Sequence, residues 1–260
     1  AWPSTRMVSI LSASTANSIA VRLSLPSRNE AGAAGPALAG PMVPIAGDPV
    51  TIDAGKVSGT MLENGLKAYL GIPFAAPPVR ENRWRAPQKV KAWTGLYNAD
   101  TKRAECVQPL RSPSINHYFG EEDVSEDCLY LNLWAPASAK AGDKLPVLVW
   151  IYGGAFNVGS ASSPIYAGDA LARKGVIYVA INYRLGVMGF LAHPELSKES
   201  GHNASGNWGF LDQVAGLQWV QRNIAQFGGD PANVTLVGQS AGSMSINNLQ
   251  ASPLAKGLFT

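Results

Sequence analysis

A short apolar strand that runs directly into a serine between two glycines constrains the fold of this chain most. Residues 234–237 are strand formers, and a G-x-S-x-G sequence follows them at residues 238–242. Residues 243–249 can continue as a helix, so Ser240 falls on a sharp strand-to-helix turn that exposes its hydroxyl. The glycines let strand and helix pass closely. The pattern predicts a nucleophilic serine in an α/β fold, although an ordinary turn in a chain with 27 glycines among 260 residues explains the pentapeptide alone equally well.

A second glycine-rich loop follows another buried strand. Residues 145–151 form an almost continuous apolar run, which is typical of a strand covered on both faces of a parallel sheet. The loop at residues 152–156 reads Tyr-Gly-Gly-Ala-Phe and can expose consecutive backbone N–H groups, as acyl-transfer enzymes need for their oxyanion. A plain glycine turn and a phosphate-binding loop are the alternatives, but the G-x-G-x-x-G and P-loop signatures are absent here. The two loops together predict a serine hydrolase of the α/β-hydrolase type.

Further motifs follow one another along the chain and make the prediction more specific. They occupy residues 69–75, 125–132 (with E-D-C-L-Y-L-N), 182–191, 206–213 and 227–231. In this order they resemble the N-terminal half of the type-B carboxylesterase/lipase family, which includes para-nitrobenzyl esterases, liver carboxylesterases and cholinesterases. The resemblance covers about residues 50–260.

The resemblance implies roles for individual positions. Ser240 would be the nucleophile of an acyl-enzyme mechanism that needs no cofactor. The backbone N–H groups of Gly154, Ala155 and Ala241 would form the oxyanion hole. The positions that support these two loops would be Gly153, Gly238, Gln239 and Gly242.

Two of these positions depart from the common family pattern. Ala155 replaces a third glycine, which keeps the backbone donor and changes only the space around it. Gln239 replaces a glutamate that often precedes the serine, and the replacement removes a negative charge near the site. We therefore expect a weaker preference for cationic substrates such as choline esters.

The chain has two cysteines, Cys106 and Cys128, and no metal site is expected because a structural zinc ion needs four ligands. In the family that the chain resembles, matching cysteines close a disulfide loop. A loop of about twenty residues would add roughly 3 kcal/mol of stability. A disulfide implies an oxidising compartment, so we expect a secreted or periplasmic protein. Two free thiols in a cytosolic enzyme are the alternative.

Charge and composition limit the partners. The net charge is +3, from 21 basic and 18 acidic residues, which gives little reason to expect nucleic-acid binding. No apolar run reaches the roughly 18–20 residues that span a bilayer. The expected partner is a small-molecule ester, and the oligomeric state stays open. A basic group is expected to be solvated: Arg80, Arg83, Arg85, Lys89 and Lys91.

The element pattern predicts a mostly parallel central sheet with helices on both faces. Residues 1–48, rich in Ala, Ser, Gly and Pro, are expected to be a disordered or processed leader. Residues 49–260 are expected to form the N-terminal part of an α/β-hydrolase catalytic domain. The expected strands are 50–52, 55–60 and 67–70, as the antiparallel start of the sheet, then 129–134, 145–151, 176–182 and 234–237. The expected helices are 169–174, 208–227 and 243–249.

The serine lacks an obvious base. In α/β-hydrolases the triad follows the order Ser, acid, His, but residues 241–260 contain no His, Asp or Glu. His117, His193 and His202 all precede Ser240, and we reject each as the base. We therefore expect a fragment cut after the nucleophile helix, which would be nearly inactive and aggregation-prone alone.

Three questions stay open at this level. A catalytically inactive, cholinesterase-like interaction protein is the alternative to a carboxylesterase, although such proteins typically lose the serine; a lipase is a third possibility. Arg184 is expected in a structural ion pair with Asp212 or Asp127. Tyr152 and Phe156 fit either a substrate pocket or the core.

Overall fold

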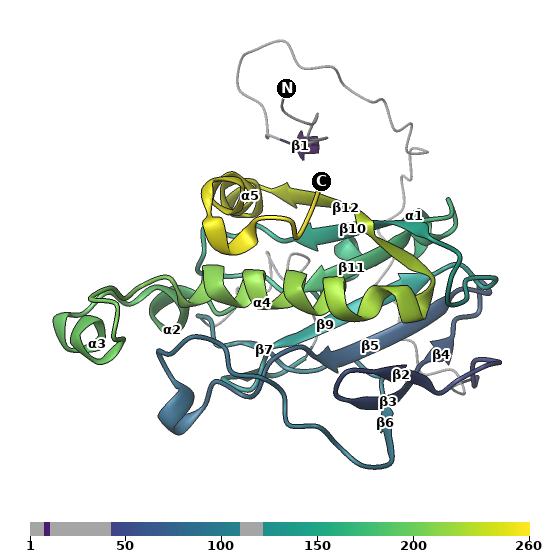
Figure 1. The fold of residues 1–260 in the computed structure, drawn as a ribbon, viewed down its shortest axis with the longest axis horizontal. Helices are drawn as coiled ribbons and strands as arrows, with labels where there is room; N and C mark the ends of the chain where they lie inside the picture. Colours follow the sequence, from purple (N-terminus) through teal and green to yellow (C-terminus); the bar gives the residue numbers. More distant parts are fainter. Residues whose placement is uncertain (1–7, 11–42, 110–121) are drawn as a thin grey trace, which may run out of the picture.

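The computed structural model describes residues 8–10, 43–109 and 122–260, and its centre is a seven-stranded sheet (Figure 1). Strands β1, β12, β10 and β11 pair in parallel, whereas β9, β5 and β4 add antiparallel pairs on the other side. In sheet order the strands are β1 (Val8–Ile10), β12 (Gly229–Gln239), β10 (Leu145–Ile151), β11 (Ile177–Ile181), β9 (Tyr130–Ala135), β5 (Lys67–Pro73) and β4 (Thr60–Met61).

Helices cover both faces of this sheet, as the sequence predicts. Gly168, at the start of α1 (Asp169–Ala172), lies against the ring of Tyr178 on one face. Gly216 of α4 (Trp208–Asn223) lies against Ile181 on the other face, because residues three apart in a strand point to opposite sides. Figure 1 shows α4 running across the sheet, with α5 (Ala241–Ala251) beside β12. The structure is therefore the α/β-hydrolase fold that the motifs predict.

Among the described residues, two short helices and four 3₁₀ turns complete the helical elements. Helices α2 (Gly186–Phe190) and α3 (Pro194–Glu199) follow β11. The 3₁₀ turns are Arg80–Asn82, Pro164–Tyr166, Ile224–Phe227 and Pro253–Ala255. The helix predicted over residues 208–227 is thus α4 continued by one 3₁₀ turn.

In the part of the chain that the structure describes, five short strands form two small sheets outside the main one. They are β2 (Val50–Ile52), β3 (Gly55–Ser58) and β6 (Leu96–Asn98) in one sheet, and β7 (Glu105–Cys106) and β8 (Val124–Ser125) in the other. The expectation that residues 50–60 start the central sheet is wrong for β2 and β3. The chain leaves one sheet for the other at Gly59, where a β-carbon would stand 2.4 Å from the carbonyl oxygen of Ala68.

Contacts with the fold begin before residue 49. Ile45 is buried, and Asp48 accepts hydrogen bonds from the hydroxyl of Tyr69 and the backbone of Gly59, both at 2.7 Å. Val8 to Ile10 form β1 at the outer edge of β12. Most of the predicted leader lies outside the described residues, so the boundary at residue 49 stays a prediction.

Candidate active site

Ser240 connects β12 to α5 in a strained backbone conformation. Its φ of 54° and ψ of −122° fall outside the regions that a side chain normally allows. The side chain is exposed, and within the described part of the chain it has no hydrogen-bond partner. Such strain persists only where the surrounding structure enforces it, and it is common at functional sites.

The glycines on either side of the serine are required by close packing. A β-carbon on Gly242 would stand 2.0 Å from the carbonyl oxygen of Ile151, and one on Gly238 would stand 3.0 Å from the same oxygen. The end of β10 therefore passes directly beneath the turn. This contact fixes Ser240 at the end of the sheet where the parallel strands finish.

The loop after β10 lies against the serine turn. A β-carbon on Gly153 would stand 2.5 Å from the carbonyl oxygen of Gln239 and 2.9 Å from Cβ of Ser240. Gly154 has a φ of +120°, and a β-carbon there would meet the carbonyl oxygen of Val158 at 2.0 Å. The structure thus brings together the two glycine-rich loops that the sequence separates by more than eighty residues.

Three backbone N–H groups at this junction have no acceptor among the described residues. They belong to Gly154, Ala155 and Ala241. The loop closes on itself because the carbonyl oxygen of Gly154 accepts from the N–H groups of Asn157 and Val158, at 3.0 and 3.1 Å. Ala155 holds a left-handed φ of 53°, which an alanine adopts only at some cost. The arrangement offers free donors beside an exposed hydroxyl.

Tyr152 belongs to the core rather than to a substrate pocket. Its ring stacks on Tyr183 at 4.5 Å between centroids. Its hydroxyl donates to the carbonyl oxygen of Tyr183. In return, the hydroxyl of Tyr183 donates to the carbonyl oxygen of Tyr152. Burial raises the pKa of Tyr152 well above its usual range. The tyrosine therefore anchors the root of the loop.

Phe156 occupies the opposite end of the loop and is only half-buried. It packs edge-on against Phe190 and Phe210, with centroids 5.2 and 5.6 Å away. The three rings form an apolar cluster next to Ala155. This cluster is the part of the loop's surroundings that can border a bound acyl or alcohol group.

The described histidines do not approach Ser240 as hydrogen-bond partners. His193 caps α3, where its Nδ1 accepts from the N–H of Glu195 at 3.3 Å. His202 is exposed. His117 lies outside the described residues. The rejection of His193 as the base agrees with its structural role.

A buried ion pair connects α4 to the segment after β11. Arg184 donates from Nε and Nη2 to Asp212, at 2.8 and 2.7 Å, and its backbone N–H donates to the same carboxylate. Both side chains are almost fully buried. Burial raises the pKa of the Asp212 carboxyl, and Arg184 opposes that rise. Of the two expected partners of Arg184, Asp212 and Asp127, the structure therefore pairs it with Asp212.

Cys106 and Cys128 form the disulfide that the family resemblance implies. The two cysteines are 22 residues apart, their Cα atoms are 4.9 Å apart, and both side chains are buried. The described residues contain no free cysteine. The disulfide joins β7 to Cys128, which lies two residues before β9.

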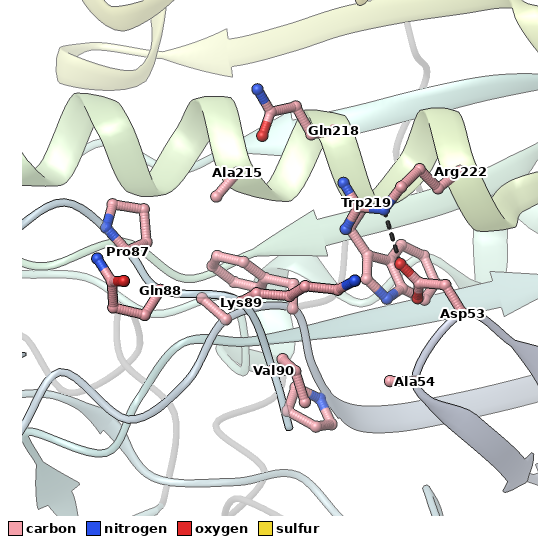
Figure 2. A pocket seen from close by; sticks show the side chains of 13 residues that line it. Asp53, Ala54, Pro87, Gln88, Lys89, Val90, Ala215, Gln218, Trp219 and Arg222 are labelled. Atoms are coloured by element: carbon pink, nitrogen blue, oxygen red, sulfur yellow. Dashed lines mark hydrogen bonds and ion pairs between the residues drawn. The ribbon is translucent and has the colours of Figure 1, made fainter. Parts of the chain in front are cut away.

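Two cavities among the described residues lie away from the serine. Figure 2 shows one of about 360 Å³ between α4 and residues 87–90, where Arg222 is ion-paired with Asp53 at 2.7 Å. A larger one of about 680 Å³ lies between α3 and the start of α4. Neither includes Ser240 or the loop after β10. In the described ranges no three or more His, Cys, Asp or Glu side chains gather as metal ligands, and no helix has the length and apolarity for a membrane span.

Several residues that support the site carry no assigned role in the sequence analysis. Gln213 of α4 donates to the hydroxyl of Ser245 at 3.0 Å, and Ser243 donates to the carbonyl oxygen of Gly238 at 2.9 Å. The sequence offered one signal for such a role, which is a polar residue at a position where the helical pattern predicts burial. These bonds attach α5 to α4 and to the serine turn.

Comparisons with known proteins agree with this geometry. A model of the carboxylesterase family matches residues 47–260. The fumonisin B1 esterase of Sphingopyxis macrogoltabida is 48% identical over 206 residues, which are 79% of this chain and 37% of that protein. The para-nitrobenzyl esterase of Bacillus subtilis is 48% identical over 211 residues, 81% of this chain and 42% of that protein.

Solved structures of carboxylesterases have the same fold as this chain. A para-nitrobenzyl esterase structure superposes with a TM-score of 0.73 at 47% identity, over 81% of this chain and 42% of that one. A carboxylesterase of Geobacillus stearothermophilus superposes with the same TM-score at 45% identity, over 81% of this chain and 41% of that one. The chain spans about two-fifths of the length of these relatives. By its sequence, its fold and the positions of its motifs, the chain belongs to the carboxylesterase family.

Proposed function

We propose that this chain carries the nucleophile and the oxyanion hole of a serine carboxylesterase. The observation that carries the proposal is the contact between the two loops, which puts an exposed Ser240 in strained backbone beside free N–H donors. Gly154, Ala155 and Ala241 are the proposed donors. An acyl-transfer enzyme needs both parts side by side, because the oxyanion forms on the oxygen of the carbonyl group whose carbon the nucleophile attacks.

The proposed reaction proceeds through an acyl-enzyme. The Oγ atom of Ser240 attacks the ester carbonyl carbon while a general base takes its proton. The carbonyl oxygen becomes an oxyanion, and the three N–H groups bind it. The intermediate then collapses, the alcohol leaves with a proton, and water releases the carboxylic acid. The base is not among the described histidines, and the reaction needs no metal or organic cofactor.

The proposed substrates are small neutral carboxylic esters. Gln239 is uncharged and contacts the loop of Gly153, so the serine turn itself presents no carboxylate to a cationic substrate. The half-buried cluster of Phe156, Phe190 and Phe210 offers an apolar border for the acyl or alcohol group. The disulfide favours an oxidising compartment, and we propose a secreted or periplasmic protein.

Labelling with a fluorophosphonate tests the proposal. The probe forms a covalent bond only with an activated serine, so we expect the full-length protein to be labelled at Ser240, as mass spectrometry of the peptide would show. Ser240→Ala should abolish labelling and hydrolysis of 4-nitrophenyl acetate without changing the melting temperature. A folded full-length protein that resists labelling would instead favour an inactive interaction protein.

A further inference from the structure

The segment just after the oxyanion loop is irregular and yet buried. Residues 159–163 belong to no helix or strand, and each of them is buried. A buried backbone outside helices and strands still needs hydrogen-bond partners, from side chains, turns or water. The partners of this segment therefore show what holds the loop in front of it.

Two asparagines on the central sheet supply part of these bonds. The N–H of Ala161 donates to Oδ1 of Asn182 at 2.9 Å, and its carbonyl oxygen accepts from Nδ2 of Asn132 at 3.2 Å. Asn132 belongs to β9, and Asn182 follows β11 directly. The middle of the segment is thus attached to the sheet.

The beginning of the segment is held by Gln108 from the disulfide loop. The N–H of Gly159 donates to Oε1 of Gln108 at 2.9 Å, and Nε2 of Gln108 donates to the carbonyl oxygen of Gly159 at 3.1 Å. The amide therefore takes both backbone groups of one residue, as a neighbouring strand would. Nε2 also lies 3.1 Å from the carbonyl oxygen of Cys106, so the disulfide loop orients the amide.

Gly159 transmits this position to the oxyanion loop. A β-carbon on Gly159 would stand 2.6 Å from the carbonyl oxygen of Gly153 and 2.6 Å from the ring of Tyr152. The preceding residue, Val158, has its carbonyl oxygen packed on Gly154. A shift of Gly159 toward Gly153 would therefore press on the loop that carries the proposed donors.

We propose that Gln108 is a positioning residue for the oxyanion hole, an inference that rests on the proposed function of Gly154 and Ala155. Gln108 touches no reacting atom. It binds the backbone of Gly159, which packs on Gly153, while the neighbouring Val158 packs on Gly154. The carbonyl oxygen of Cys106 accepts from the Gln108 amide.

The test compares Gln108→Met with the wild type in the full-length enzyme. Methionine keeps the length and bulk of the side chain and removes its amide. We expect kcat to fall about tenfold or more, since misplacing a group by an ångström can cost up to a hundredfold. KM should change less than twofold. Gln226→Met, at an exposed glutamine, is the matched control and should behave as wild type.

Binding of a trifluoromethyl ketone separates positioning from a merely structural role. The ketone forms a tetrahedral adduct with the serine and places an oxyanion among the N–H donors. Its affinity should therefore fall by the same factor as kcat in Gln108→Met, while fluorophosphonate titration still counts one active site per protein. Unchanged kcat and ketone affinity would overturn the proposal. The proposal would also be overturned if Gln108→Met lost activity only because fewer of its molecules are titrated by the fluorophosphonate, with the titrated ones keeping the wild-type kcat.

These outcomes are distinct from failure of the proposed function. If the wild type is neither labelled at Ser240 nor inactivated by Ser240→Ala, the active site itself is wrong. If the wild type passes both checks and Gln108→Met is unaffected, only the positioning role is wrong.

Discussion

Gly153 lies so close to Ser240 that a β-carbon on the glycine would stand 2.9 Å from Cβ of the serine. One residue of the loop after β10 thus touches the turn after β12, although the two are far apart in sequence. This contact sets the distance between Ser240, the proposed nucleophile, and the N–H groups that follow Gly153. The two halves of the site can therefore be disturbed by a single methyl group.

Gly153→Ala should remove most of the esterase activity. The added methyl would also meet the carbonyl oxygen of Gln239 at 2.5 Å, so the loop or the serine turn must shift. We expect kcat to fall on the order of a hundredfold, because the donors and the nucleophile would no longer fit one tetrahedral intermediate. Steady-state hydrolysis of 4-nitrophenyl acetate measures the loss.

Gly95→Ala is the control for the general cost of losing a glycine. Gly95 has a φ of +82° and open space around it. The substitution should cost about 1–2 kcal/mol of stability through backbone strain and leave kcat unchanged. Equal activity losses in the two variants would show that contact with the serine turn is not the cause.

Removal of the disulfide should lower stability. Cys106→Ala with Cys128→Ala opens a loop whose ends are 22 residues apart, and the chain-entropy model gives about 3 kcal/mol for that loop length. Urea unfolding of the full-length protein measures the difference. Dithiothreitol should destabilise the wild type by a similar amount and leave the double variant unaffected. If dithiothreitol reduces the disulfide of the wild type and its free energy of unfolding does not change, the prediction is wrong.

Asp212→Asn should destabilise the fold strongly. The substitution leaves the buried Arg184 guanidinium without its carboxylate, which costs about 3–5 kcal/mol for pairs of this kind. Arg222→Gln is the matched control, because its pair with Asp53 is partly exposed and should be worth less than about 1 kcal/mol. Equal losses in free energy of unfolding would mean that burial does not make the Arg184–Asp212 pair more important for stability than the Arg222–Asp53 pair.

Acid should weaken the contact between Arg83 and Glu126. The side-chain hydrogen bonds from Arg83 lower the pKa of Glu126 below its ordinary value of 4.5. A lowered folded-state pKa stabilises the fold above the unfolded-state pKa, and this contribution is lost as the pH falls through the folded-state value. The wild type should therefore be more stable than Glu126→Gln at pH 7, and the difference should shrink below about pH 4.5. Melting temperatures across pH 3 to 7 measure it, and a constant difference would contradict the assignment.

The sequence predicts the local elements of this fold well. The apolar runs that became β10 and β11, and the helical spacing that became α4, depend only on neighbouring residues. The serine turn was predictable because Gly238 and Gly242 flank it in a recognisable pattern. The separate small sheet was not, because the choice of β6 over the central sheet as the partner of β3 depends on contacts 40 residues away.

The residues that support the loop after β10 could not be predicted from sequence patterns for the same reason. Gln108 and Gly159 are 51 residues apart, and an amide has no local signature that reveals its partner. Asn132 and Asn182 appeared only inside family motifs. Their roles became visible once the buried backbone of residues 159–163 was matched to its donors and acceptors.

The two asparagines have a consequence for how the segment after the loop responds to pH. Asn132 binds the backbone of Gly71 as well as that of Ala161, so one neutral group joins two strands to the active-site segment. A carboxamide neither gains nor loses a proton in the range where proteins stay folded. These crosslinks therefore do not depend on the protonation of the asparagine side chains. Ion pairs such as Arg83–Glu126 can weaken in acid, whereas these carboxamide hydrogen bonds keep their donors and acceptors.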